Sequence, residues 1–368
     1  MTFRTALRVG TALVTAAAVA VLAACGGNDS SSSSSATTAT SGSSPNLSGK
    51  TAVMQTFGGD IDKAIKAHYT DPVDQATGLQ TTIGNPTDYA KLTTQVKTQN
   101  VEWTTVQGDA FFSLANCGKL LESMKGKVDT SEIDPKYLTD DCSIPGETYF
   151  YLPMYDANKF KSAPPSSWAD FFDTKKYPGK RGVFGAYVFN GMLEGALIAD
   201  GVPPDQLYPL DVERARKKIG SIKGDIKFYD SLAQATQLME SGEVAMIVDI
   251  PADGVKANQN GANFKPMWNQ PMESWDAYFA PKGTNTEAAA ALLQRVSTAE
   301  AQGGVASDSP TNGVTTKENL AKAPTDPMVK EFSPNVDDHA KTAIVLDQAW
   351  WAKNLDEVTT KWTDFVGG

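Results

Sequence analysis

Histidine and cysteine are scarce in this chain of 368 residues, which carries two histidines, His68 and His339, and three cysteines. A zinc or iron site needs several such ligands, so the sequence predicts no metal site and no cofactor. The chain also lacks the Gly-x-Ser-x-Gly, Ser-x-x-Lys and His-Glu-x-x-His motifs of serine and zinc hydrolases. We therefore expect a protein that is not an enzyme. An extracellular hydrolase that works with two carboxylates needs no fixed motif and is the alternative.

Long hydrophobic runs are lacking after residue 24, so we expect no membrane-spanning helix there. The one long apolar run, residues 9–22, follows Arg4 and Arg8 and leads into Ala23, Ala24 and Cys25. A positive start, an apolar run and a small-residue cleavage site are the order of a secretory signal peptide. Residues 1–24 are therefore predicted to be a signal peptide that directs the chain out of the cytoplasm.

Cys25 is the residue through which this ending resembles the lipobox of bacterial lipoproteins. The resemblance implies cleavage before Cys25 and lipid on its thiol and its new amine, which would anchor the protein to the outer face of the bacterial cell membrane. An ordinary secreted protein with a stray cysteine is the alternative. Residues 25–48 are mostly small or polar and have little to bury, which predicts a flexible tether.

Basic residues are fewer than acidic ones, 33 against 43. Without Arg4 and Arg8 of the signal peptide, the formal charge falls to about −12. An acidic surface disfavours nucleic acid and anionic lipid headgroups as partners. It suggests a cationic or neutral small partner, although solubility alone also explains the balance. The expected contact with the membrane is therefore the lipid anchor only.

Cys117 and Cys142 are the two cysteines that remain, and export would place them in an oxidising compartment. Both lie in polar segments that are rich in turn-forming residues. Two cysteines are too few ligands for a zinc site, so we predict a disulfide between them. It would close a loop of roughly 25 residues and stabilise the fold by about 3 kcal/mol.

Strands and helices alternate along the roughly 320 residues after the tether, a length that suggests two domains. Apolar periodicity and turn residues predict a parallel or mixed sheet with helices on its faces, an α/β fold. The expected strands are 51–57, 79–83, 101–106, 181–184, 226–229, 244–248 and 276–279. The expected helices are 61–68, one from residue 86, 168–172, 186–199, 211–219, 232–239, 287–296, 344–351 and 355–365.

Several short segments carry a recognisable pattern along the chain, namely Thr56–Asp60, Gln107–Ala110, Ser167–Phe172, Lys176–Lys180, Leu238–Ala245, Trp275–Ala277, Pro281–Gly283 and Trp350–Asn354. In this order they resemble the extracellular solute-binding proteins of ABC importers, above all the spermidine/putrescine-binding branch. The resemblance implies the type II periplasmic-binding-protein fold, a monomer with two α/β lobes. Its ligand would lie in the cleft between the lobes and pass to the transmembrane subunits of an ABC permease.

The lobes implied by this resemblance are 49–153 with 274–315, and 154–273 with 316–368. The chain would cross between them near residues 152–158, 272–276 and 311–317. Ligand sites in open α/β sheets lie beyond the carboxyl ends of strands. Both arguments predict ligand-binding residues in the same loops, namely Thr56, Phe57, Gly58, Asp109, Asp249, Trp275 and Asp276. Tyr155 and Tyr187 are candidate aromatic walls, and Asn312 is a candidate from the third crossing.

Asp276 is the strongest of these candidates, because the acid at this position clamps a ligand ammonium in the polyamine binders. A buried carboxylate without a cation would be costly. Five of the candidates also have a structural alternative. Asp276 could cap a turn, Asp109 and Asp249 could cap helices, Trp275 could belong to the core, and Asn312 could be a turn residue.

Two departures from the polyamine-binding pattern affect the expected ligand. The first strand leads into Thr56 and Phe57 where the family has a Trp-Thr pair, and Tyr187 stands where it has a second amine-binding acid. A ligand with one cationic end, such as a betaine or an amino-acid-like compound, therefore competes with a polyamine. No arginine lies in the named loops, which argues against phosphate, sulfate or a sugar acid.

Overall fold

The computed structural model describes residues 45–336 and 338–368, and residues 44–368 form one compact unit. The expected signal peptide, Cys25 and nearly all of the expected tether lie outside the described residues. Within the described part of the chain, none of the helices combines the length and apolar character needed to cross a bilayer.

A mixed sheet organises the described chain, and its strands run in the order β2-β1-β3-β9-β4-β7-β5-β6. β8 and β10 add to β4, and β11 adds to β9. The expected α/β fold is therefore confirmed. The strands are β1 (Thr51–Gln55), β2 (Gln80–Gly84), β3 (Thr105–Asp109), β4 (Ser143–Asp156), β5 (Arg181–Phe184), β6 (Ile226–Tyr229), β7 (Met246–Asp249), β8 (Phe264–Pro266), β9 (Met272–Phe279), β10 (Gly313–Val314) and β11 (Ile344–Val345).

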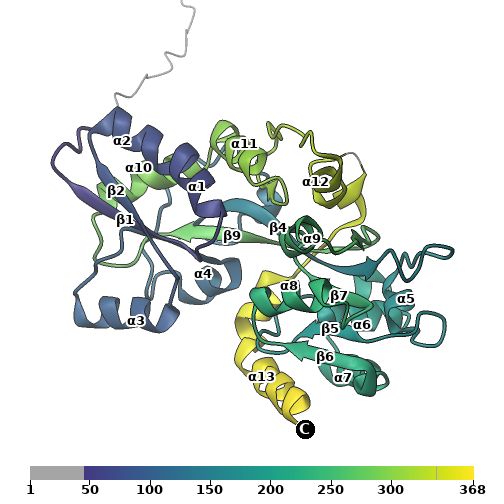
Figure 1. Ribbon diagram of the computed structural model, residues 1–368. Helices are drawn as coiled ribbons and strands as arrows, with labels where there is room; N and C mark the ends of the chain where they lie inside the picture. Colours follow the sequence, from purple (N-terminus) through teal and green to yellow (C-terminus); the bar gives the residue numbers. More distant parts are fainter. Residues whose placement is uncertain (1–44, 337) are drawn as a thin grey trace, which may run out of the picture. The chain divides into compact units, whose positions relative to one another are not determined.

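The long strand β4 belongs to both parts of the sheet, and Figure 1 shows it beside β9. Its first part, from Ser143 to Tyr151, pairs antiparallel with β9, and a bulge interrupts this ladder between Pro145 and Thr148. From Leu152 onward it pairs with β7 and β8 instead. Parallel pairs surround this centre, β1 with β2 and β3 on one side and β5 with β6 and β7 on the other.

Helices cover both faces of the sheet. They are α1 (Ile61–Ile65), α2 (Asp71–Thr77), α3 (Tyr89–Thr98), α4 (Ala110–Asn116), α5 (Trp168–Phe172), α6 (Met192–Ala199), α7 (Val212–Gly220), α8 (Leu232–Glu240), α9 (Pro251–Gln259), α10 (Thr286–Val296), α11 (Ala299–Asp308), α12 (Pro327–Phe332) and α13 (Gln348–Gly367). A π-helical turn, Lys66–Thr70, joins α1 to α2, and short 3₁₀ turns lie at Pro135–Tyr137, Pro204–Gln206, Lys223–Asp225 and His339–Thr342.

Alternation along single strands explains why helices are needed on both faces. In β7, Met246 and Val248 pack among apolar residues of α5, α6, α7 and α13, whereas Ile247 packs with α8 and α9. In β1, Met54 packs with α1, α10 and α11, whereas Val53 contacts the cluster that contains Leu92 of α3. Successive side chains of a strand point to opposite faces, so each strand buries apolar residues on both sides.

Capping side chains determine where several helices begin. Asp88 accepts a hydrogen bond from a backbone N–H of the first turn of α3, and Ser231 and Thr298 do the same for α8 and α11. Asp347 caps the first turn of α13 in the same way. Such caps satisfy N–H groups that have no partner inside the helix and stabilise it by about 1 kcal/mol each.

Several expected elements differ from the structure. The helix expected at 186–199 begins only at Met192, because Gly191 has φ of +72° and interrupts the chain before it. The third strand is β3 at 105–109 rather than 101–106. The expected helices 344–351 and 355–365 are one helix, α13, preceded by the short strand β11.

The expected disulfide is confirmed, because Cys117 and Cys142 are bonded, with their Cα atoms 5.4 Å apart. It links the end of α4 to the residue before β4. Asp140 lies beside the bridge and accepts hydrogen bonds from the backbone N–H groups of Cys142 and Ser143, at 2.7 and 2.9 Å. Its carboxylate is thus engaged by the turn that enters β4.

Candidate functional site

Asp109 and Asp276 lie directly opposite each other on the antiparallel strands β3 and β9. Both are more than nine-tenths buried, with 7% and 8% of their surfaces exposed. The side-chain amide of Gln107 donates to Oδ2 of Asp276 at 2.8 Å, and its oxygen accepts from the backbone N–H of Phe57 at 3.1 Å. Gln107 therefore orients the Asp276 carboxylate and ties it to the loop after β1.

Two tyrosines hold the carboxylate of Asp109. The hydroxyl of Tyr89, at the start of α3, donates to Oδ2 at 2.6 Å and accepts from the backbone N–H of Asp109 at 2.7 Å. The hydroxyl of Tyr187, in the loop after β5, donates to Oδ1 at 3.0 Å. β3 and β5 lie on different sides of β4 in the sheet, so Asp109 connects segments from both sides.

Burial raises the pKa of Asp276 well above its usual range, and the negative charges of Glu147 and Asp109 raise it further. Burial also raises the pKa of Asp109, while hydrogen bonds from Tyr89 and Tyr187 oppose this. Among the described residues, no lysine, arginine or histidine forms an ion pair with either acid. A cation brought in from outside would therefore stabilise the ionised form of Asp276.

Glu147 adds a third buried acid behind this pair. It is fully buried in the bulge of β4 and accepts a hydrogen bond from the hydroxyl of Tyr278 at 3.0 Å. Burial raises its pKa, and the hydrogen bond from Tyr278 opposes this rise. The region around Asp276 thus gathers acids that are compensated by phenol hydroxyls and an amide rather than by cations.

Tyr149 and Tyr151 on β4 also belong to this region. Their rings meet edge to face, with centroids 6.0 Å apart. Burial raises the pKa of both phenols, and the charge of Asp109 raises each of them further. Aromatic faces beside buried acids form a lining that suits the apolar body of an amine and its charged head.

Asp249 and Asp253 form a further acid pair beyond these tyrosines. Asp249 ends β7 and is fully buried, and Asp253 lies in the first turn of α9 with 8% of its surface exposed. Burial raises the pKa of Asp249, and the neighbouring Asp253 raises it further. Burial raises the pKa of Asp253 to about 6.

The first loop keeps its predicted residues near the acids. Phe57 is 41% exposed, and its backbone N–H reaches Gln107. The buried hydroxyl of Thr56 donates to the carboxylate of Asp62 at 2.8 Å, so this side chain stabilises the loop itself. Gly58 has φ of +90°, and a Cβ there would lie 3.3 Å from Asn85, so the backbone conformation favours glycine at this position.

Three other predicted residues make different contacts. Trp275 points to the opposite face of β9 from Asp276 and packs edge to face on Tyr137 in the core, at 5.1 Å between centroids. Tyr155 lines a separate pocket of about 520 Å³ with Trp268 and His339. Asn312 accepts from the hydroxyl of Ser309 at 2.9 Å, within its own turn.

Sequence reasoning missed Tyr89, Tyr149, Tyr151 and Asp253 as members of the region. Tyr89 lies in the helix expected from residue 86, but nothing in the sequence indicates that its hydroxyl reaches Asp109. The alternation of Tyr149 and Tyr151 is the pattern of one strand face, but β4 itself was not predicted. Asp253 follows Asp249 by four residues, across the start of a helix.

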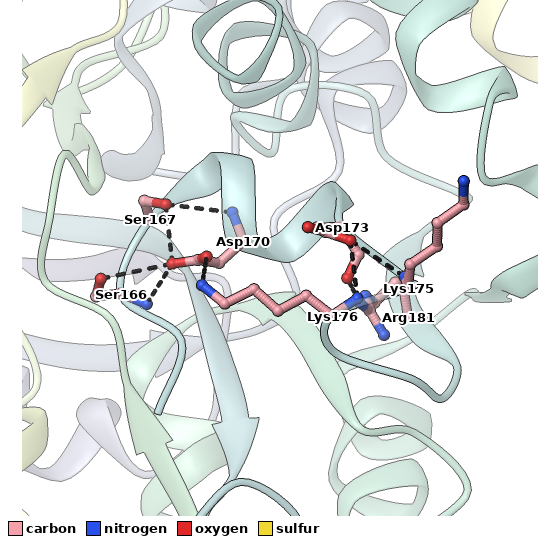
Figure 2. A network of polar contacts seen from close by, with 7 residues as sticks. All are labelled: Ser166, Ser167, Asp170, Asp173, Lys175, Lys176 and Arg181. Atoms are coloured by element: carbon pink, nitrogen blue, oxygen red, sulfur yellow. Dashed lines mark hydrogen bonds and ion pairs between the residues drawn. The ribbon is translucent and has the colours of Figure 1, made fainter. Parts of the chain in front are cut away.

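The resemblance segment Ser167–Lys180 has a structural role around helix α5 (Figure 2). Ser167 caps the helix, and the carboxylate of Asp170 accepts from the backbone N–H of Ser166 at 3.0 Å and from Lys176 at 3.3 Å. The Asp173 carboxylate accepts from the backbone N–H of Lys176 at 2.9 Å. These contacts shape a cap and the turn after α5.

Arg181 completes this network at the start of β5 (Figure 2). Its guanidinium is fully buried and donates to the backbone carbonyls of Phe171, Gly179 and Tyr177, at 2.7, 2.6 and 2.6 Å. Burial lowers the pKa of Arg181 to about 10. Its N–H groups are used by the backbone, so Arg181 serves the fold around α5.

Known proteins resemble this chain in sequence and in fold. Residues 68–331 match the family model of the bacterial extracellular solute-binding proteins. The gamma-aminobutyric acid-binding protein of Pseudomonas aeruginosa is 26% identical over 314 residues, which cover 82% of this chain and 87% of the relative. A solved GABA receptor is 31% identical with a TM-score of 0.76, covering 86% of this chain and 98% of the receptor. An ABC transporter substrate-binding protein from Bradyrhizobium japonicum is 26% identical with a TM-score of 0.78, covering 86% of this chain and 99% of that protein.

Proposed function

The chain belongs to the family of bacterial extracellular solute-binding proteins, and we propose that it captures a small cationic solute, an amine, at Asp276 and the residues around it. Its function is that of the extracellular solute-binding component of an ABC transporter. These relatives are receptors rather than enzymes, which confirms the expectation that the chain is not an enzyme. The alternative function, a hydrolase that works with two carboxylates, is therefore excluded.

The environment of Asp276 is the observation that carries the proposal. Its carboxylate is nine-tenths buried, and Gln107 donates to one of its oxygens. No ion pair of the described residues neutralises it. A ligand ammonium would supply the missing charge, and Tyr149 and Tyr151 would cover the ligand's apolar part.

The proposed ligand class is cationic amines, which includes polyamines but is not limited to them. Polyamines, betaines and amino acids all carry a cationic nitrogen that could pair with Asp276. The relatives from Pseudomonas aeruginosa and the solved GABA receptor are named for gamma-aminobutyric acid, which also has such a nitrogen. We propose the cationic nitrogen as the feature that all candidate ligands share.

Two lobes and a lipid anchor belong to the same proposal. The exchange of partners along β4, from β9 to β7 and β8, supports a boundary between lobes near Leu152. A lipid on Cys25 and a tether would keep a monomeric receptor near its permease and raise its local concentration there. The tether's r.m.s. reach would be roughly 25 Å.

A thermal-shift screen of amines, betaines and amino acids tests the proposal, followed by calorimetric titration of the compounds that stabilise the protein. We expect cationic compounds to raise the melting temperature and to bind with one-to-one stoichiometry. Stabilisation by neutral sugars or anions alone would overturn the proposed ligand class.

A further inference from the structure

The acid pair Asp249 and Asp253 stands outside the hydrogen-bonded group around Asp276. Both oxygens of Asp249 and Oδ2 of Asp253 are buried without a hydrogen-bond partner among the described residues. Buried carboxylate oxygens without donors are costly, and native proteins rarely keep them unless a ligand, an ion or a shared proton compensates them. The pair therefore has the character of an empty site for positive charge.

Strand register places this pair at the same edge of the sheet as two aromatic residues. β5 pairs in parallel with β7 and with β6, and continuing the register from Gly182 and Ile247 puts Phe184 beside Asp249. Phe184 stacks on Tyr229, with centroids 4.9 Å apart. This edge is formed by the carboxyl ends of β5, β6 and β7, where ligands of open α/β sheets bind.

Aromatic contacts connect this edge with the site around Asp276. The ring of Phe184 also lies 6.0 Å from that of Tyr187, whose hydroxyl donates to Asp109. Tyr151, next to the partner of Asp249 on β4, has its phenol pKa raised by the charges of both Asp249 and Asp109. The two acid groups are thus separated by tyrosine and phenylalanine rings.

The groups that face the pair supply little positive charge. From β6, the Tyr229 hydroxyl donates to the carbonyl of Val248 at 2.7 Å. Tyr229 and the backbone N–H of Ile250 are neutral groups that oppose the rise in the pKa of Asp249. From α9, the charge of Lys256 opposes the rise in the pKa of Asp253, whereas the Thr236 hydroxyl on α8 donates to the carbonyl of Leu232 at 3.2 Å. Lys256 is exposed and forms no ion pair with either acid among the described residues.

We propose that Asp249 and Asp253 form a second cation-binding subsite, which takes the far cationic group of a two-ended ligand and holds a proton while it is empty. This inference rests on the proposed function and adds the ligand's second end. In the polyamine pattern the second acid stands at the position of Tyr187, which here donates to Asp109. In this chain the second acid pair comes from β7 and α9.

A proton exchange follows from the burial of the pair. Burial raises the pKa of both carboxyls, to about 6 for Asp253, so the empty pair retains a proton that an exposed pair would lose. When the cationic group arrives, a carboxyl O–H releases its proton to solvent, and the carboxylate pairs with the ligand. No other bond changes in this step.

The subsite also separates ligand classes. A ligand with an amine at one end and a carboxylate at the other would place negative charge against Asp249 and Asp253, which like-charge repulsion disfavours. A ligand with amines at both ends would compensate both acid groups. Dications are therefore favoured over zwitterions.

Titration calorimetry with matched probes tests the subsite. The probes are α,ω-diamines of three to six carbons, 1-aminobutane and 4-aminobutanoate, titrated at pH 6 in two buffers of different ionisation enthalpy. We expect a diamine to bind wild type at least tenfold more tightly than 1-aminobutane and to release protons. Asp249→Asn should cost at least tenfold for the diamine, little for 1-aminobutane, and should reduce the proton release. Asp205→Asn, which removes an exposed charge, should behave as wild type.

The outcomes distinguish the subsite from the proposed function. Equal binding of a monoamine and every diamine, or an Asp249→Asn effect that is the same for both, would overturn the subsite while leaving an amine receptor. Tighter binding of 4-aminobutanoate than of any diamine would also overturn it. Failure of every amine to bind would overturn both. Asp253→Asn provides a second variant if Asp249→Asn does not fold, which its melting curve would reveal.

Discussion

The Tyr187 hydroxyl donates to Oδ1 of Asp109, at 3.0 Å, and so connects the loop after β5 with the end of β3. Tyr89 donates to the other oxygen of the same carboxylate, at 2.6 Å, from α3, which precedes β3 in the chain. The two hydroxyls thus make the same kind of bond to one acid, but only Tyr187 comes from the other side of β4.

Removing the Tyr187 hydroxyl should change how the two proposed lobes hold together without ligand. A hydrogen bond to a charged group contributes about 1.5–3 kcal/mol. Tyr187→Phe should therefore shift the ligand-free protein toward open forms, seen as a larger radius of gyration in X-ray scattering. Tyr89→Phe is the matched control and should leave the radius unchanged. If the radius of gyration changed equally in both variants, or in neither, the Tyr187 hydroxyl would not be what holds the two proposed lobes together.

The guanidinium of Arg181 should be essential for the stability of the fold around α5. Arg181→Met leaves the carbonyls of Phe171, Tyr177 and Gly179 buried without donors, which should cost about 3 kcal/mol or more of unfolding free energy. Lys176→Met, at an exposed ion pair in the same network, should cost much less, because solvent screens such a pair. Urea unfolding measures both. Similar losses in the two variants would show that the buried bonds are not the source of stability.

Reducing the Cys117–Cys142 bond should lower stability and leave the ligand class unchanged. The bond joins residues 25 positions apart, and loss of such a cross-link costs about 3 kcal/mol in the chain-entropy model. The double variant Cys117→Ser and Cys142→Ser should therefore melt several degrees lower. Comparing wild type with and without reductant provides the second measurement. An unchanged melting temperature in both experiments would contradict this contribution.

The empty acid pair should make the protein less stable as the pH rises. The pKa of Asp253 is about 6 in the folded protein and about 3.9 in an unfolded chain, so the folded state retains a proton that the unfolded state releases. Stability should therefore fall between about pH 4 and pH 6, by up to about 3 kcal/mol. Asp253→Asn should gain stability relative to wild type over this range in urea unfolding. A constant difference between the two proteins across it would contradict the pKa shift.

The fold was partly predictable because several segments combine a periodic pattern of apolar residues with turn residues that mark where an element ends. β5 and β6 were predicted with their observed ends, since short apolar runs there follow turns and precede helices. β4 was missed because Pro145, Gly146 and Pro153 lie within it, and such residues normally end strands. Its pairing with β9 on one stretch and β7 on the next is a tertiary property that no local pattern carries.

The candidate site was predictable only at strand ends. Asp109 and Asp276 were found because carboxyl ends of strands gather at one edge and because the resemblance points to the same positions. Tyr89 and Tyr187 bond to Asp109 from residues 20 and 78 positions away, so their pairing needs the fold. Trp275 adjoins Asp276 in sequence, but strand alternation turns it to the opposite face.

The binding affinity of Asp276→Asn tests the central claim most directly. Asparagine keeps the shape of the side chain and removes its charge, so the variant should fold and lose the attraction for an ammonium group. Calorimetric titration with the tightest amine from the screen should show at least a tenfold weaker dissociation constant, about 1.4 kcal/mol. Asp205→Asn, at an exposed position, should bind as wild type. An unchanged dissociation constant in Asp276→Asn would contradict the account, because the buried carboxylate would then not be the ligand's partner.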